Sequence, residues 1–162
     1  MNVGGFYFLI EKYFVDFPDP KLMRNREVID GIVHNRPCFY AFQESNSEIY
    51  WMIPFSSKLE KYKEVYRKNM VKYGRCDTIV FGEVLGGEKA FLIQNMCPAI
   101  LEYIGNEYVD RESKSGFVEI PPPLQNELIQ KGKSVLILVR RGKTLVFPDI
   151  LKIEKELKSK FK

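Results

Sequence analysis

The sequence predicts an α+β domain built on an antiparallel sheet or small barrel with surrounding helices. Short strand-like runs come in pairs joined by polar or glycine turns, a pattern typical of antiparallel hairpins. Helical patterns gather between and after these pairs, whereas a parallel fold would alternate strands with helices. The 162 residues, 45% of them hydrophobic and 14% aromatic, can form one sizeable core. We therefore expect a single domain over residues 1–162.

The first half of the chain predicts one isolated strand and one hairpin. A strand is expected over 6–10, where an aromatic and aliphatic run follows a glycine pair, and a helical turn over 11–16. The Pro-Asp-Pro that follows ends regular structure. Two further strands are predicted over 37–43 and 49–55, with polar residues between them. The short polar turn between these two runs predicts that the second strand returns beside the first as an antiparallel pair.

An amphipathic helix is predicted over 58–73, because apolar residues recur there at three- and four-residue steps. The expected core stripe consists of Leu59, Tyr62, Tyr66, Met70 and Tyr73. Gly74 suits the C-terminal cap of this helix. Runs over 78–85 and 89–95, separated by Gly86-Gly87, predict a second hairpin.

The C-terminal part predicts a short strand over 117–120 and, after three prolines, a helix over 124–140. Gly132 and the dense apolar run over 135–139 leave a buried strand open as the alternative to the end of that helix. A closing helix is expected over 148–161. Its apolar stripe consists of Ile150, Leu151, Ile153, Leu157 and Phe161.

Composition limits the chemistry. A net charge of +4 permits a polyanionic partner without requiring one. Three cysteines lie far apart without a CxxC spacing, and the chain has one histidine, so we expect no disulfide framework, no metal and no cofactor. The sequence also lacks the GxGxxG, Walker A, HExxH and GxSxG motifs of common nucleotide-binding, protease and esterase sites.

The apolar run near the N-terminus is too short to span a bilayer, and it lacks the basic start and cleavage site of a signal peptide. We therefore expect a cytoplasmic protein that does not associate with a membrane.

The most informative motif joins a strand to a helix at Ser56-Ser57-Lys58. The first N–H groups of a helix lack partners within the helix, and the helix dipole adds positive potential there, so such a turn can hold a phosphate. The structural alternative is a capping box in which Ser57 and Glu60 only start the helix.

His34 and Arg36 precede the predicted strand over 37–43. A histidine can transfer protons near neutral pH, and a guanidinium can stabilise charge on a phosphate. A surface or packing histidine and a solvated arginine are the structural alternatives. Basic and aromatic residues also alternate at Lys12-Tyr13 and Lys61-Tyr62, a mixture that suits irregular RNA but also fits a solvated helix face over the core.

Three segments together resemble a known family: 6–13 (FYFLIEKY), 53–58 (IPFSSK) and 92–100 (LIQNMCPAI). They are similar to segments of the endoribonuclease toxins of type III toxin–antitoxin systems, the ToxN and AbiQ family, in particular its CptN branch. The similarity follows the chain in order over nearly its whole length.

This resemblance implies a MazF- or Kid-like fold, a role in phage defence and a metal-independent endoribonuclease activity on cellular RNA. It also implies inhibition by a small antitoxin RNA whose pseudoknot repeats bind the toxin in a closed toxin–RNA hetero-oligomer. Attack of the ribose 2′-OH on the adjacent phosphate would then give a 2′,3′-cyclic phosphate and a free 5′-OH.

The resemblance assigns the hydroxyl motif of the family to Ser56 and Ser57, and Lys58 and Arg36 are the nearest matches to its basic residues. The family order Thr-Ser-Pro-Lys appears here without the proline. In this interpretation Ser57 orients the phosphate, Lys58 and Arg36 stabilise its charge, and His34 or a nearby group handles a proton.

RNA would be bound by Tyr13, which matches an early tyrosine of the family, with Tyr7, Lys12 and Lys61 beside it. Two other functions remain open from the residues alone. One is a non-catalytic RNA-binding protein. The other is a metabolic or protein-interaction domain with an incidental positive charge.

Overall fold

The computed structural model describes all residues from Met1 to Lys162. Its strands are β1 (Phe6–Leu9), β2 (Arg26–Ile29), β3 (Ile32–Asn35), β4 (Cys38–Gln43), β5 (Tyr50–Ser56), β6 (Ile79–Val84), β7 (Gly87–Leu92), β8 (Cys97–Ala99) and β9 (Ile104–Glu107). Its α-helices are α1 (Glu11–Asp16), α2 (Leu59–Tyr73), α3 (Pro122–Arg140) and α4 (Ile150–Ser159), and short 3-10 helices cover Ile93–Asn95 and Leu101–Tyr103.

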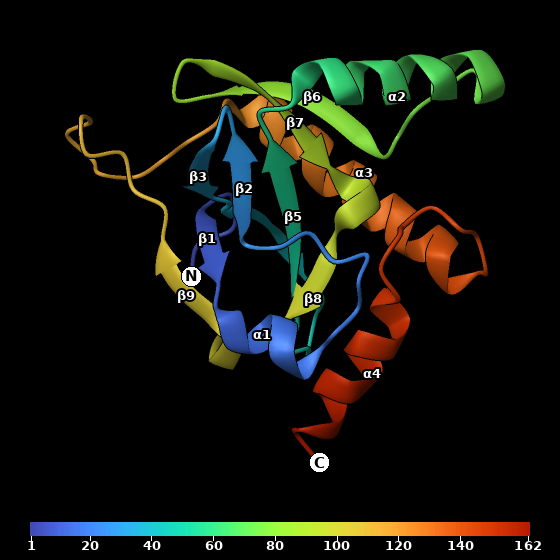
Figure 1. Cartoon of the computed structure of the whole chain (residues 1–162). Coiled ribbons are helices and arrows are strands. Elements are labelled where there is room, and N and C mark those ends of the chain that lie inside the picture. The colour runs from blue at the N-terminus through green and yellow to red at the C-terminus, as the bar shows by residue number, and fades with distance from the viewer.

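A seven-stranded antiparallel sheet forms the centre of the molecule (Figure 1). Its order is β6-β7-β5-β4-β1-β9, and β8 pairs with β5 beside β7. The first part of β5 pairs with β8, and its last two residues pair with β7. Strand β5 therefore joins the β6–β7 hairpin to the rest of the sheet. The predicted α+β class with an antiparallel sheet is therefore confirmed. The strands do not close into a barrel, because the end strands β6 and β9 do not pair.

The two hairpins predicted from local patterns are both present. β4 pairs with β5 across the polar turn, and β6 pairs with β7. The second turn is shifted by one residue from the predicted Gly86-Gly87, because Val84 pairs with Gly87 and the turn consists of Leu85 and Gly86. Both turn residues have positive φ, of 51° and 78°, as a two-residue hairpin with the twist of the strands requires.

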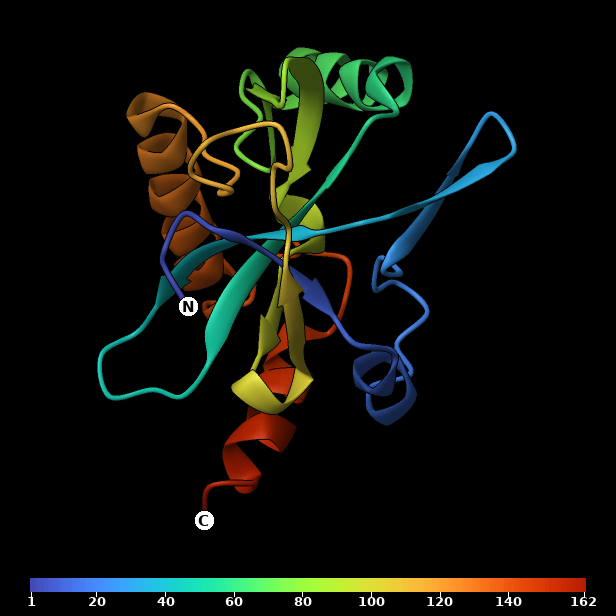
Figure 2. The same ribbon diagram turned by 90° about the vertical axis from the view of Figure 1, so that its left-hand side faces the viewer.

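A third hairpin, β2–β3, was not predicted. Its four pairs run from Arg26–Asn35 to Ile29–Ile32, and it forms a separate two-stranded sheet. Figure 2 shows it extending away from the main sheet. Its turn residues Asp30 and Gly31 have φ of 50° and 76°. Asp-Gly is a strong two-residue turn signal, so this hairpin could have been found from the sequence.

Helix α2 ends as predicted, with Gly74 in the left-handed region at φ 72°. Its expected apolar stripe is buried only at the N-terminal end, where Tyr62 packs with Ile79 and Leu92. Met70 and Tyr73 are exposed. The prediction for these two residues was wrong because the far half of α2 extends past the sheet (Figure 1) and has nothing to cover.

Helix α3 is helical throughout, so the alternative of a strand over 135–139 is excluded. Gly132 explains how it packs: a Cβ there would lie 3.1 Å from the Phe42 ring, so the glycine lets the helix approach β4 closely. The predicted strand over 117–120 is reduced to one isolated bridge between Phe117 and Val109. Strand β9, which was not predicted, forms the sheet edge instead.

Helix α4 is shorter than predicted, and of its expected stripe Ile150, Ile153 and Leu157 are buried. Leu151 and Phe161 are exposed. The three cysteines are buried and unpaired. None of the helices is long and apolar enough to cross a membrane.

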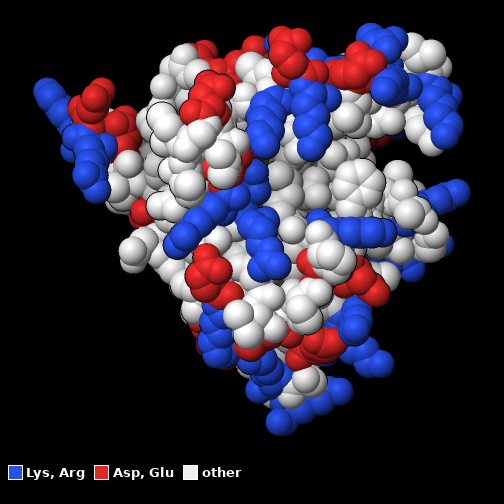
Figure 3. All heavy atoms as spheres, viewed as in Figure 1, with Lys and Arg blue, Asp and Glu red and all other residues white.

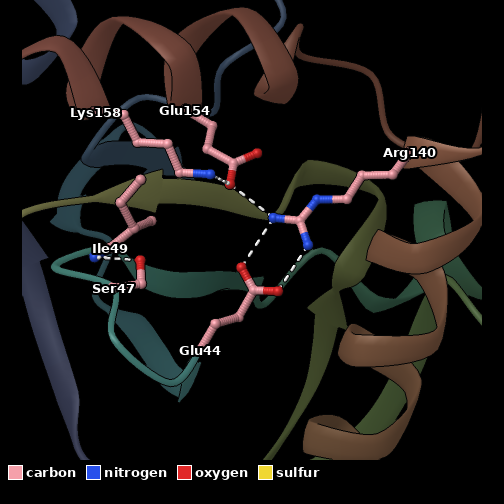
Figure 4. Close-up of polar contacts among 6 residues, drawn as sticks. All are labelled: Glu44, Ser47, Ile49, Arg140, Glu154 and Lys158. Carbon is pink, nitrogen blue, oxygen red and sulfur yellow. Dashed lines mark hydrogen bonds and ion pairs between the residues drawn. The ribbon is translucent and has the colours of Figure 1, made fainter.

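A group of four charged side chains, here called the Arg140 clamp, joins α3 and α4 to the turn after β4 (Figure 4). Arg140 donates from Nη1 and Nη2 to the two carboxylate oxygens of Glu44, at 2.7 and 2.9 Å, and from Nη2 to Glu154 at 2.7 Å. Lys158 donates to the same oxygen of Glu154 at 2.6 Å. The hydrogen bond from Arg140 lowers the pKa of Glu44.

Candidate active site

A cleft of about 340 Å³ lies between the β2–β3 hairpin, the end of β5 and the β6–β7 turn. Three of the five predicted catalytic residues, His34, Arg36 and Ser57, line it together. The other polar lining residues are Glu27, Asn35, Lys89 and Tyr108. A slightly larger cavity of about 390 Å³, between the segment after α1 and α4, contains none of the predicted site residues.

The β2–β3 hairpin brings His34 to the cleft. In its register Glu27 lies directly opposite His34, and directly opposed residues of an antiparallel pair point to the same face. His34 is exposed, whereas the Glu27 side chain is only 7% exposed. The hairpin thus places one buried carboxylate beside one accessible imidazole.

Arg36 follows β3 directly and is held by both its backbone and its side chain. Its N–H donates to the carbonyl of Asn25 at 2.7 Å, and Nη1 donates to the carbonyl of Arg24 at 2.8 Å. Nη2 lies 3.2 Å from Oε1 of Glu27. The side chain is 9% exposed, and its buried Nε has no hydrogen-bond partner. A buried donor without a partner costs free energy, so this orphaned N–H sets Arg36 apart from the other ion-paired arginines of the chain.

Ser56 is almost completely buried at the end of β5. Its hydroxyl donates to Oε1 of Glu27 in a short hydrogen bond and accepts from the N–H of Lys58 at 3.1 Å. Ser56 therefore connects the central sheet to the separate β2–β3 hairpin. It holds Glu27 in place and does not itself line the cleft.

Ser57 points to a different partner. Lys89 of β7 donates from Nζ to its hydroxyl at 2.6 Å, because the pairing of Ser56 with Ala90 brings these two side chains together. The Ser57 hydroxyl is the only hydrogen-bond partner of the Lys89 ammonium, and no carboxylate lies within ion-pair distance of it. Its positive charge is thus directed into the cleft by a neutral hydroxyl and is not neutralised by a carboxylate.

The alternative of a capping box is not observed. The N-cap of α2 is Lys58, and no side chain caps that end of the helix. The helix starts one residue later than the capping box needs, and the Ser57 hydroxyl is bonded to Lys89 instead. Lys58 itself is exposed and does not line the cleft. Lys89 occupies the place beside Ser57 that we had predicted for Lys58.

The predicted RNA-binding residues lie outside this cleft. Tyr13 is completely buried, its hydroxyl donates to the carbonyl of Pro98 at 2.7 Å, and burial raises its pKa well above the ordinary value. Its ring packs edge-on against Phe14 and Tyr103. A ring enclosed in this way cannot stack on a base, so the structure does not support the role predicted for Tyr13.

The other three differ in accessibility. Tyr7 is buried, and its hydroxyl accepts from the N–H of Asn2 at 2.9 Å. Lys12 is exposed but is paired with Asp16 at 2.7 Å and Glu102 at 2.8 Å. Lys61 is exposed, with Nζ 5.3 Å from the centre of the Tyr62 ring. Of the four, Lys61 alone is both accessible and free of an ion pair.

Four polar cleft residues were not predicted: Glu27, Asn35, Lys89 and Tyr108. The Asp30-Gly31 turn signal would have placed Glu27 opposite His34. Lys89 and Tyr108 carry no local signal, because they reach the cleft only through strand pairing between distant segments. Tyr108 is half-buried, and its ring packs edge-on against Phe8 at 5.8 Å.

The residues give the cleft a cationic character, since Arg36 and Lys89 face one carboxylate, Glu27. Figure 3 shows Lys and Arg side chains gathered below α2 on the face seen in Figure 1. No group of three or more His, Cys, Asp or Glu side chains is arranged so that it could hold a metal ion. The chain matches no model of a known protein family and no curated protein.

Proposed function

We propose that the protein is a metal-independent endoribonuclease toxin of a type III toxin–antitoxin system. One observation carries the catalytic part of this proposal. His34, Arg36, Ser57 and Lys89, which come from three separate parts of the chain, line a single cleft together with one carboxylate. Two cations, a hydroxyl and proton-transferring groups are what the cleavage of a phosphodiester by its own 2′-OH requires.

Each of these four residues has a role in this reaction. The Arg36 guanidinium and the Lys89 ammonium neutralise the non-bridging oxygens of the scissile phosphate as it becomes pentavalent. Ser57, which accepts a hydrogen bond from Lys89, fixes the position of that ammonium and can donate its own proton to the phosphate. His34 exchanges a proton with the reacting oxygens. Lys89 replaces Lys58 as the cation beside the serine.

The partner we propose is a small antitoxin RNA with pseudoknot repeats, which blocks the cleft within a closed toxin–RNA assembly. The resemblance of the three sequence segments supports this, and so does the cleft, because its cations bind a phosphate of an inhibitor as well as that of a substrate. The site of action is the cytoplasm, where the substrate would be cellular RNA.

The catalytic proposal is tested with purified protein and a labelled RNA in buffer containing EDTA. We expect cleavage to products with 2′,3′-cyclic phosphate and 5′-OH ends, identified by mass spectrometry. The matched control is the same RNA with 2′-O-methyl groups, which lacks the nucleophile and should remain intact. RNA that is bound but never cut would favour the alternative of a non-catalytic RNA-binding protein.

The partner is tested separately, by expressing the protein together with the DNA just upstream of its coding region. We expect it to purify with an RNA of uniform length, seen as high absorbance at 260 nm and one band on a denaturing gel. Random fragments, or protein without RNA, would contradict an RNA antitoxin while leaving the nuclease proposal intact.

A further inference from the structure

Glu27 is the only acidic side chain that lines the cleft. It lies on β2 with its side chain 7% exposed, directly opposite His34 on β3. Buried carboxylates are uncommon, and this one is held between a hydroxyl and a guanidinium. Its burial and its two partners hold this carboxylate in a fixed position at the cleft.

The two oxygens of this carboxylate have different surroundings. Oε1 accepts from the Ser56 hydroxyl and lies 3.2 Å from Nη2 of Arg36. Oε2 has no partner in the protein, yet the only buried side-chain polar atoms without a partner are Nε of Arg36 and Nε1 of Trp51. Oε2 is therefore not completely buried, and it belongs to a side chain that lines the cleft. One oxygen fixes the orientation of the group, and the other is free to act.

The Glu27 carboxylate meets the requirements for a general base. Such a base needs a fixed orientation and a free acceptor atom within reach of the proton that it removes. His34 is accessible but forms no hydrogen bond that would orient its ring. It suits the opposite step, the delivery of a proton to a leaving group. The opposed register of the hairpin keeps the two groups on one face.

We propose that Glu27 is the general base of the nuclease and His34 its general acid, an inference that rests on the proposed function. Oε2 of Glu27 takes the proton as the O–H bond of the ribose 2′-OH breaks and the 2′ oxygen forms its bond to phosphorus. The bond from phosphorus to the 5′ oxygen breaks, and that oxygen takes a proton from the imidazolium of His34. Glu27 then loses its proton to water and His34 regains one, so both groups return to their first state.

Ser56 acts through Glu27 in this scheme. Its hydroxyl holds Oε1 and so directs Oε2 into the cleft. Ser56 is therefore a positioning residue, although the family resemblance had placed it with Ser57 in the catalytic motif.

The test compares two RNA substrates, one with the normal 5′ oxygen at the cleaved bond and one with a sulfur atom in its place. Sulfur leaves without needing a proton, so the second substrate bypasses the general acid. We expect Glu27→Gln to lower kcat by about 10²–10⁴-fold on both substrates. His34→Ala should lower kcat on the oxygen substrate and regain most of it on the sulfur substrate.

Glu154→Gln is the matched control, because it also removes a buried carboxylate that pairs with an arginine, but one that does not line the cleft. We expect it to lower the melting temperature and leave kcat unchanged. Wild-type cleavage by Glu27→Gln would overturn the proposal, as would restoration of that variant by the sulfur substrate. A wild-type protein that cleaves neither substrate would instead refute the nuclease function itself.

Ser56→Ala covers the case in which Glu27→Gln does not fold. It keeps the carboxylate but removes the hydroxyl that orients it. We expect a lower kcat with an unchanged KM on both substrates, and no rescue by sulfur. An unchanged kcat in this variant would count against Glu27 as an oriented base.

Discussion

The molecule contains two arginine–glutamate groups of similar composition and different completeness. In the Arg140 clamp, both terminal nitrogens of the guanidinium are bonded to carboxylates, and the group lies 5.9 Å from the centre of the Trp51 ring. In the cleft, Arg36 keeps a buried Nε without a partner, whereas no side-chain polar atom of the four clamp residues is both buried and unpaired.

The difference teaches how to separate a structural ion group from a functional one in the same chain. A network whose polar groups are satisfied by the protein fixes elements relative to one another. A network that leaves a buried polar group unpaired beside a cleft costs stability, and such groups concentrate at functional sites. By this criterion the clamp positions α4, and the group around Arg36 is the one that can do chemistry.

Removal of the two arginines should give the largest contrast. Arg36→Ala is expected to lower RNA cleavage by about 10²–10³-fold, because it removes a donor to the charge that develops on the phosphate. Arg140→Ala should leave the cleavage rate near that of wild type and lower the free energy of unfolding instead. Single-turnover cleavage and urea unfolding of both variants measure this. Equal loss of cleavage in the two would remove the distinction between the groups.

A second contrast concerns the two lysines near Ser57. Lys89→Ala should lower cleavage by about 10–10²-fold, since its ammonium enters the cleft unneutralised. Lys58→Ala should change cleavage little, because that side chain is exposed and outside the cleft. Both substitutions remove one positive charge. A difference between the RNA cleavage rates of the two variants at one salt concentration is therefore due to the position of the lysine and not to the net charge. The reverse order of effects would restore Lys58 to the site.

Tyr13 extends the comparison to the core. Tyr13→Phe should cost about 1 kcal/mol of stability, because the buried carbonyl of Pro98 loses its donor. RNA affinity of the folded variant should equal that of wild type. Urea unfolding and filter binding check the two expectations. A loss of affinity without a loss of stability would mean that Tyr13 does contact RNA.

The smallest effect is the pH dependence of the clamp. Arg140 lowers the pKa of Glu44, so the stabilising contribution of Glu44 is present above its ordinary pKa of 4.5 and is lost as the pH falls through the lowered native value. Because the pair is partly exposed, solvent screening limits this contribution to about 1 kcal/mol or less. Urea unfolding from pH 7 to pH 3 should show a smaller acid loss in Glu44→Gln than in wild type. An identical acid loss in both proteins would contradict a stabilising role for the pair.

Local patterns were sufficient for most secondary structure. The periodic run over 58–73 and the two hairpins around the turns after Gln43 and Val84 appear at nearly the predicted bounds. The far half of α2 and the segment over 117–120 did not follow the prediction. Periodicity states which face of an element is apolar, but not whether another element is present to cover it.

The candidate site divides in the same way. The residue types of His34, Arg36 and Ser57 were sufficient to indicate from the sequence that these side chains can bind a phosphate or transfer a proton. The sequence placed Tyr13 on an RNA surface because a basic and aromatic pattern has the same appearance on a surface and over a core. The helix α1 is too short for its apolar spacing to decide between these two.

What the sequence determined by itself is therefore the α+β class, most elements and the types of group available for chemistry, since these depend on neighbours within a few residues. Only the tertiary structure decided that the sheet stays open, that Lys89 and not Lys58 stands beside Ser57, and that Glu27 meets Ser56 and Arg36. The physical reason is that each of these contacts depends on the pairing or packing of segments far apart in the chain, which no local pattern of side chains specifies.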